Sequence, residues 1–222
     1  MGIILSDRNN ILTAKSLVAI LVVMFFSLAN GGFLKAQDSN YHFGVRGGVG
    51  MSTLSGFENN GLRLGIAAGG YVKACFLEHS SIDAELSYSL GGQQVEKWLE
   101  NGTEQLKLYS KYNLNYLNLP ILYQYYFTDI LGIEGGLNFR YCLGGSLKTK
   151  IGNEGWHSIN FGKNDYNSFD FGLILGVYTE NLIPNDNFFV SLRSYFGFID
   201  VLKDVGSNKN INVQITVGYM FL

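Results

Sequence analysis

The sequence predicts an all-β fold, an eight-stranded antiparallel transmembrane β-barrel preceded by a cleavable signal peptide. Apolar and polar residues alternate in eight runs, as they do in strands whose two faces meet different surroundings. Most runs exceed the ~5–6 residues of an ordinary strand and reach the ~9–11 residues that a membrane-crossing strand needs. The segments between runs are alternately longer and shorter, as expected for external loops and periplasmic turns.

The composition agrees with this fold class. The chain has 222 residues, of which 47% are hydrophobic and 15% are charged, and it contains 28 Gly, 14 Tyr and 16 Phe. Glycine and aromatic residues in short alternating runs are typical of β-barrels. The formal net charge of -2 gives no indication of a nucleic-acid partner.

The first segment has the parts of a secretory signal peptide. Arg8 and Lys15 supply the early positive charge, and Leu17–Leu28 is a continuous apolar run. That run has about 12 residues, fewer than the ~20 of a membrane-spanning helix. A short membrane anchor is the alternative interpretation.

Cleavage is predicted after Ala36, with Ala29 as the second candidate position. The predicted domains are therefore a signal peptide at residues 1–36 and one outer-membrane β-barrel domain at residues 37–222. Export by this signal and the barrel pattern together predict a location in the cell outer membrane.

The first three runs are Tyr41–Thr53, Leu62–Phe76 and Ile82–Gly91. Apolar side chains occupy the odd positions of the first run and the even positions of the other two. The polar segments Ser55–Gly61 and Leu77–Ser80 are predicted as the connections between them.

The fourth run, Lys111–Phe127, changes phase. Its second half has apolar residues at odd positions, whereas Tyr112 and Leu114 lie at even positions. This change predicts a bulge near Asn115–Leu117. Pro120 has no N–H to donate to a β-ladder, so a local irregularity is expected there too.

The last four runs are Ile133–Gly144, Phe169–Tyr178, Phe188–Phe198 and Ile211–Leu222, each with one apolar face. The final run shows the alternation most clearly, because every odd position is aliphatic or aromatic and the last two are aromatic. Aromatic residues at the end of such a strand are typical of a membrane interface.

Two connections, Glu96–Ser110 and Gly152–Asn167, are predicted to be long external loops. Because loops on a rigid scaffold tolerate variation, these two are expected to carry any specific binding. Shorter turns are predicted at Thr128–Leu131 and Glu180–Asn187.

The polar faces of the runs carry full charges in mid-strand. They would be the solvated outside of a soluble lipocalin-like barrel or sandwich, which is the alternative fold. Glycine-rich polar faces and nearly balanced charge favour a narrow lumen, in which glycine leaves room for long side chains from across the barrel. The predicted structural charge network of this lumen consists of Arg46, Arg63, Lys73, Asp83, Glu85, Glu134, Arg140, Asp170 and Arg193.

Charges in so narrow a space are expected to pair, because an unpaired buried charge costs several kcal/mol. The expected pairs are Glu134 with Arg140 and Asp83 with Arg63. Tyrosines are expected to fill the remaining volume, and the lumen is expected to exclude solutes larger than water or small ions. These tyrosines are Tyr71, Tyr178 and Tyr195.

The sequence contains no recognisable catalytic or metal-binding constellation. His42 and His79 are isolated, and the adjacent His157 and Ser158 lack an evident acidic partner. The sequence therefore predicts no enzyme activity, no cofactor and no metal site. The two cysteines, Cys75 and Cys142, fall in runs that are not neighbours, so no disulfide is expected.

Four segments carry a resemblance to a known family: GVRGGVGMSTL (44–54), ELSYSLGGQ (85–93), YLNLPILYQYYF (116–127) and DFGLILGV (170–177). With them, the mature chain resembles the PorT-like outer-membrane β-barrel family of Bacteroidetes. The resemblance implies an eight-stranded outer-membrane barrel, and one member of that family is tied to a protein-secretion system.

The predicted function is a structural or accessory role in the cell envelope, in protein secretion or envelope assembly. The alternatives are a lipid-modifying barrel enzyme and a soluble lipocalin-like ligand-binding barrel. Expected partners are outer-membrane lipid, the barrel assembly machinery during insertion and an envelope protein that the sequence does not identify.

Overall fold

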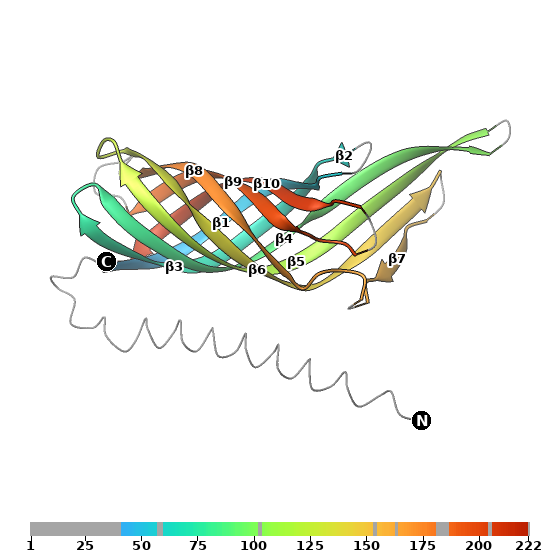
Figure 1. Ribbon diagram of the computed structural model, residues 1–222. Coiled ribbons are helices and arrows are strands. Elements are labelled where there is room, and N and C mark those ends of the chain that lie inside the picture. Colours follow the sequence, from blue (N-terminus) through green and yellow to red (C-terminus); the bar gives the residue numbers. More distant parts are fainter. Residues whose placement is uncertain are drawn as a thin grey trace, which may run out of the picture. The chain divides into compact units, whose positions relative to one another are not determined.

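The structure is a computed structural model that describes residues 41–56, 60–101, 104–152, 155–162, 164–180, 187–203 and 206–221 (Figure 1). The predicted signal peptide and both candidate cleavage positions lie outside the described residues, as does most of the predicted turn after Glu180. In the part of the chain that the structure describes, no helix is long and apolar enough to cross a membrane.

All regular structure in the described ranges is β-strand, and the strands form one antiparallel sheet. Eight strands are long, as the alternation predicts: β1 (Tyr41–Leu54), β3 (Arg63–Leu77), β4 (Ser80–Asn101), β5 (Glu104–Tyr126), β6 (Leu131–Ile151), β8 (Phe169–Glu180), β9 (Phe188–Asp200) and β10 (Lys209–Phe221). Two are short: β2 (Asn60–Gly61) and β7 (His157–Asn160).

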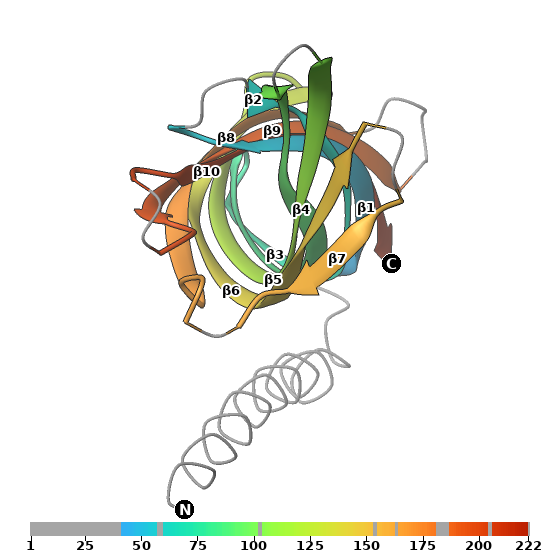
Figure 2. The same cartoon turned by 90° about the vertical axis from the view of Figure 1, so that its right-hand side faces the viewer.

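The long strands close into a ring in the order β4-β3-β1-β10-β9-β8-β6-β5, because β5 also pairs with β4 (Figure 2). Closure removes the free edges of the barrel wall, each of which would otherwise leave unpaired N–H and C=O groups. The short strands lie off the ring, with β2 paired to β4 and β7 paired to β6. The predicted eight-stranded antiparallel barrel is confirmed.

The two faces of the wall are inverted relative to a soluble barrel. Outward side chains are apolar and exposed, for example Leu64 at 71% and Ile215 at 50%. Inward side chains include charged groups with almost no exposure, for example Asp83 at 1% and Arg193 at 2%. A soluble lipocalin-like barrel would bury the apolar face, so this structure contradicts that alternative.

The first of the two predicted long loops is largely strand, and the second contains a short strand. β4 and β5 pair from Ser80 with Tyr125 to Asn101 with Glu104, so Glu96–Ser110 forms the end of a hairpin that continues past the ring (Figure 1). Part of Gly152–Asn167 is β7, which adds to β6. Alternation is weaker in these polar stretches, and for that reason the sequence pattern did not reveal them as strands.

The predicted bulge exists, but the extra residue is on another strand. β5 keeps one register with β4 throughout, whereas its pairing with β6 shifts between Asn115 and Tyr116. Asn115 pairs with Gly144 and Tyr116 with Cys142, so the unpaired residue is Leu143 of β6. The ladder between β4 and β5 is also interrupted opposite Pro120 and resumes in the same register, which confirms the irregularity expected there.

Glycines make room for inward aromatic rings, but the rings come from the neighbouring strand. A Cβ at Gly218 would lie 2.0 Å from the ring of Phe189, its direct partner on β9. A Cβ at Gly132 would lie 2.5 Å from Tyr178, its direct partner on β8. At these two positions the expectation of side chains from across the lumen is wrong.

Candidate functional site

The alternation of the strands points most predicted lumen charges inward. Arg46, Lys73, Asp83, Glu85, Glu134, Arg140, Asp170 and Arg193 are all buried, and each of them takes part in an ion pair. The ninth, Arg63, is half-buried and forms no ion pair with another described residue. The eight buried charges fall into three groups along the lumen.

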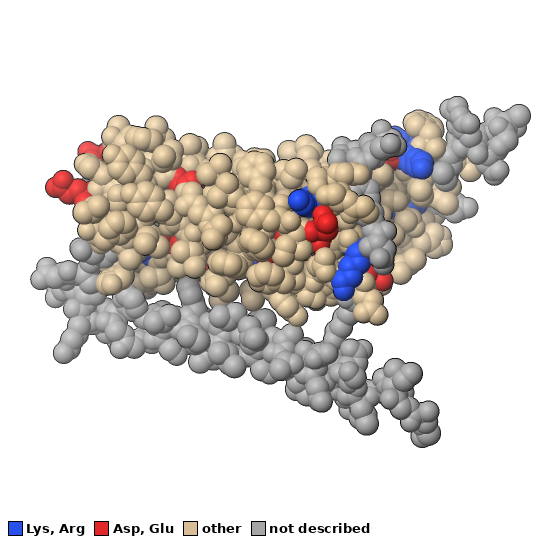
Figure 3. Space-filling view, viewed as in Figure 1, with Lys and Arg blue, Asp and Glu red and all other residues tan. Residues whose placement is uncertain are grey.

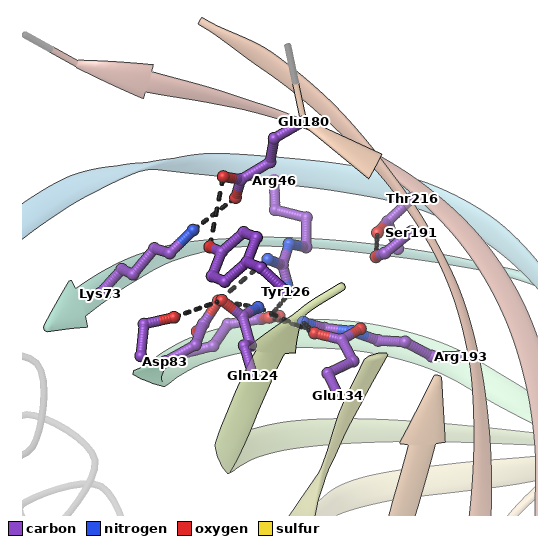
Figure 4. A network of polar contacts seen from close by, with 12 residues as sticks. Arg46, Lys73, Asp83, Gln124, Tyr126, Glu134, Glu180, Ser191, Arg193 and Thr216 are labelled. Carbon is purple, nitrogen blue, oxygen red and sulfur yellow. Dashed lines mark hydrogen bonds and ion pairs between the residues drawn. The ribbon is translucent and has the colours of Figure 1, made fainter. Parts of the chain in front are cut away.

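The central cluster consists of Arg46, Asp83, Glu134 and Arg193, which Figure 4 labels, together with Glu85. Arg46 of β1 donates Nη1 to Glu85 Oε2 at 2.9 Å and Nη2 to Asp83 Oδ2 at 3.1 Å. Arg193 of β9 donates Nη1 to Glu85 Oε2 at 2.8 Å and Nη2 to Glu134 Oε2 at 2.9 Å. Four strands of the ring are thereby joined through the lumen.

A neutral side chain that the sequence analysis did not single out completes this cluster. Gln124 of β5 donates Nε2 to Glu134 Oε2 at 3.0 Å and accepts a hydrogen bond from Ser81 Oγ at 3.1 Å. Its inward position in the fourth run was visible, and Ser81 and Glu134 are its direct partners on the adjacent strands β4 and β6. The register of these strand pairs, which alternation does not specify, decides both contacts.

The second group lies toward the short turns of the barrel and is called the turn-end pair. It consists of Lys73 on β3 and Glu180 at the end of β8. Lys73 also lies 4.9 Å from the centroid of the Tyr126 ring, and Tyr126 donates its hydroxyl to Glu180 at 3.2 Å. Figure 4 shows the contact between Lys73 and Glu180. The sequence predicts a turn at Glu180 and did not reveal it as the partner of Lys73.

The loop-end cluster surrounds Arg140 of β6 and Asp170 of β8. Their closest charged atoms, Arg140 Nη1 and Asp170 Oδ2, are 3.9 Å apart, and Arg140 Nε donates to Asn118 Oδ1 at 3.0 Å. The Arg140 guanidinium lies 3.9 Å from the Tyr116 ring centroid and 4.6 Å from that of Tyr195. Asp170 Oδ2 also accepts hydrogen bonds from the Tyr195 hydroxyl at 2.9 Å and from Asn210 Nδ2 at 3.0 Å.

The two predicted ion pairs are therefore wrong in their partners. Glu134 contacts Arg193 instead of Arg140, and Asp83 contacts Arg46 instead of Arg63. Strand register decides which inward residues lie at the same height, and a pattern of alternation does not specify register. The predicted lumen tyrosines, Tyr71, Tyr178 and Tyr195, are all buried.

An apolar cap follows the loop-end cluster. Its buried members are Leu54, Leu114, Tyr116, Cys142, Tyr166, Val201 and Leu202. Leu114 breaks the alternation of its run because it belongs to this cap. An isolated bridge between Tyr166 and Leu202 joins two of the segments that supply it.

A small cavity lies between the central and loop-end clusters. Its volume is about 30 Å³, and Glu85, Asn138, Arg140 and Arg193 are among the residues that line it. A water molecule needs about 10–15 Å³ measured in this way, so the cavity has room for about two.

A family model of the outer membrane protein beta-barrel domain matches residues 35–203, most of the chain. The chain belongs to this family. The inverted wall and the charged lumen are thus those of an outer membrane β-barrel protein, which agrees with the predicted outer-membrane location. No curated protein sequence matches this chain.

Several solved outer membrane proteins are similar to this barrel in fold. Ail of Yersinia pestis is 13% identical with a TM-score of 0.43, covering 82% of this chain and 99% of its own. OprG of Pseudomonas aeruginosa is 16% identical with a TM-score of 0.41, covering 82% and 97%. Neisserial surface protein A is 12% identical with a TM-score of 0.46, covering 81% and 97%.

In the described part of the barrel, the side chains that could act as nucleophiles or bind a metal ion do not gather into one site. His157 and Ser158 are consecutive in β7, so their side chains project from opposite faces of the strand. No group of three or more His, Cys, Asp or Glu side chains able to hold a metal ion occurs in the described ranges. Cys75 and Cys142 are both free, as expected from their separate strands.

Proposed function

We propose that this protein is a closed structural barrel of the outer membrane, with an accessory role in the cell envelope. The observation that carries this proposal is the central cluster, in which side chains from opposite sides of the ring meet in the lumen. An eight-stranded barrel has an interior just wide enough for side chains to fill. The turn-end pair lies on one side of this cluster, and the loop-end cluster and apolar cap lie on the other.

Single-channel recording of the folded protein in a planar bilayer tests the closed lumen. We expect no stable porin-like conductance steps, because the central cluster crosses the lumen and the adjoining cavity has room for only about two water molecules. Heat-modifiable migration on a gel, measured on the same preparation, shows that the recorded protein is folded. Large, stable steps from folded protein would overturn the proposal.

We propose further that the accessory role is in protein secretion or envelope assembly, with the β4–β5 hairpin contacting an envelope protein. The resemblance to PorT-like barrels supports this role, and the paired hairpin extends beyond the ring. A pull-down from solubilised membranes tests it, with a variant in which residues 97–108 are replaced by a short turn as the control. A partner retained equally by both proteins would exclude the hairpin as its binding surface.

We expect no enzyme activity and no cofactor. The opposite orientation of His157 and Ser158 supports this expectation, because a general base must lie within hydrogen-bond reach of its nucleophile. Turnover of membrane lipid by purified, folded protein would contradict it, provided that a His157→Ala variant loses the activity.

A further inference from the structure

Past the ring, strands β4, β5, β6 and β7 continue as a sheet at the loop end of the barrel. Directly paired residues share a face of this sheet. The register pairs Trp98 with Lys107, Tyr109 with Lys150, and Lys111 with Lys148. We name as the basic face the surface formed by Lys107, Lys111, Lys148, Lys150, Trp98, Tyr109 and Trp156.

The basic face continues the outward, apolar face of the barrel wall. On β5 and at Phe127, which follows it, odd-numbered residues point outward as far as Leu117, and the same alternation leads to Lys111 and Lys107. In the view of Figure 3, Lys and Arg side chains on the surface likewise gather mainly toward the end that carries β7. The basic face therefore flanks the membrane and does not line the lumen.

Within the basic face, positive charge is only partly compensated. Lys107 Nζ lies 2.6 Å from Glu96 Oε2 and 4.8 Å from the Tyr109 ring centroid. The hydrogen bond from Lys107 lowers the pKa of Glu96, and the same contact raises the pKa of Lys107, so both remain charged. The other three lysines form no ion pair with a carboxylate in the described part of the chain.

Two of these uncompensated lysines are direct cross-strand partners. Lys111 on β5 faces Lys148 on β6, and Lys111 also lies 4.7 Å from the ring centroid of Trp156. Directly opposed side chains have Cβ atoms only about 4.5–5.5 Å apart, and like charges at this distance destabilise a sheet. An anion bound between them would relieve that repulsion.

The distance of the basic face from the apolar band of the membrane indicates which kind of molecule carries such an anion. With a rise of ~3.4 Å per residue and a tilt of ~45°, Phe127–Leu117 spans about 24 Å along the membrane normal, close to the ~25 Å apolar band of such barrels. By the same geometry Lys111 lies about 14 Å beyond Leu117. A phospholipid headgroup layer is only about 5–8 Å thick on each side, so a taller headgroup is needed to reach these lysines.

We propose that the basic face binds the phosphorylated sugar headgroup of a glycolipid in the outer leaflet. Phosphates would lie against Lys111, Lys148 and Lys150, and the exposed Trp98 and Trp156 rings would pack against sugar rings. The proposal places the short turns in the periplasm, as is usual for such barrels. It does not depend on whether the lumen is closed.

Tryptophan fluorescence gives a direct test, because the chain has 2 Trp and both lie on the basic face. Folded protein in neutral detergent is titrated with purified lipopolysaccharide, with the same material after phosphate removal, and with phosphatidylglycerol. We expect a saturable change with the phosphorylated glycolipid, and at least tenfold weaker binding of the other two. Added salt should weaken the binding.

Matched variants separate the face from general positive charge. K111Q/K148Q should lose at least tenfold in affinity, whereas K97Q/K203Q/K209Q, which changes exposed lysines elsewhere at the loop end, should bind like the wild type. Without glycolipid, K111Q alone should raise the urea midpoint slightly, because it removes the like-charge pair. Equal binding of the dephosphorylated glycolipid or of phosphatidylglycerol, or equal losses in both variants, would overturn the proposal.

Discussion

The central cluster and the loop-end cluster lie in the same lumen but neutralise charge in different ways. The central cluster sets two arginines among three carboxylates, with several ion-pair contacts of 2.8–3.1 Å. In the loop-end cluster one arginine and one carboxylate approach only to 3.9 Å, and aromatic rings and amides supply most of the remaining contacts.

This difference shows two ways of filling a narrow interior with charged side chains. Where charges are dense, each guanidinium bridges two carboxylates, so removal of one arginine leaves more than one anion unpaired. Where charge is sparse, hydrogen bonds from neutral groups and contacts with ring faces also stabilise the buried charges. The consequence of losing an arginine should therefore depend on which cluster it belongs to.

The largest effect is expected for Arg193→Met. Glu85 would keep only Arg46, and Glu134 would lose its guanidinium, so the cluster would hold three carboxylates and one arginine. Removing one partner of a buried ion pair typically costs about 3–5 kcal/mol of stability. The measurement is the free energy of unfolding in urea, followed by heat-modifiable migration in lipid vesicles.

Arg193→Lys is the matched control for this variant. It retains the charge but not the planar fork that reaches two carboxylates, so an intermediate loss is expected. A methionine variant as stable as the wild type would show that Arg193 is not needed to neutralise these carboxylates. The contrast between the clusters would then disappear.

A smaller effect is expected for Arg140→Met in the loop-end cluster. Asp170 keeps its hydrogen bonds from Tyr195 and Asn210, and the methionine retains part of the packing between the Tyr116 and Tyr195 rings. The loss of cation–π contact and of the longer ion pair should cost about 2 kcal/mol. The same urea experiment measures it, and a loss equal to that of Arg193→Met would refute the comparison.

The smallest effect is expected for the exposed pair of Glu96 and Lys107. Its side chains are 40% and 31% exposed, although the two charged atoms approach to 2.6 Å. Ion pairs in contact with water contribute little to stability because solvent screens them. Glu96→Gln should leave the urea midpoint unchanged, and a clear decrease would indicate that the hairpin folds cooperatively with the ring.

The sequence by itself determined the number of long strands, the direction of their faces and the inward position of the charges. Period-two alternation carries this information, because successive side chains in a strand must point to opposite sides. Apolar positions such as Leu64 and Ile215 were therefore assigned outward correctly, and charged positions such as Asp83 and Arg193 inward. The interruption near Pro120 was also predictable, since proline lacks a backbone N–H.

Only the tertiary structure decided which inward residues meet. Glu134 contacts Arg193, 59 positions away, because strand register pairs both of them with Gly176 of the intervening strand β8. Strand ends were also underestimated, as for Glu180 and for the β4–β5 hairpin, where polar residues interrupt the apolar alternation. Alternation specifies which face of a strand a residue occupies. Backbone pairing with neighbouring strands decides the register, the bulges, such as that at Leu143, and the length of a polar strand.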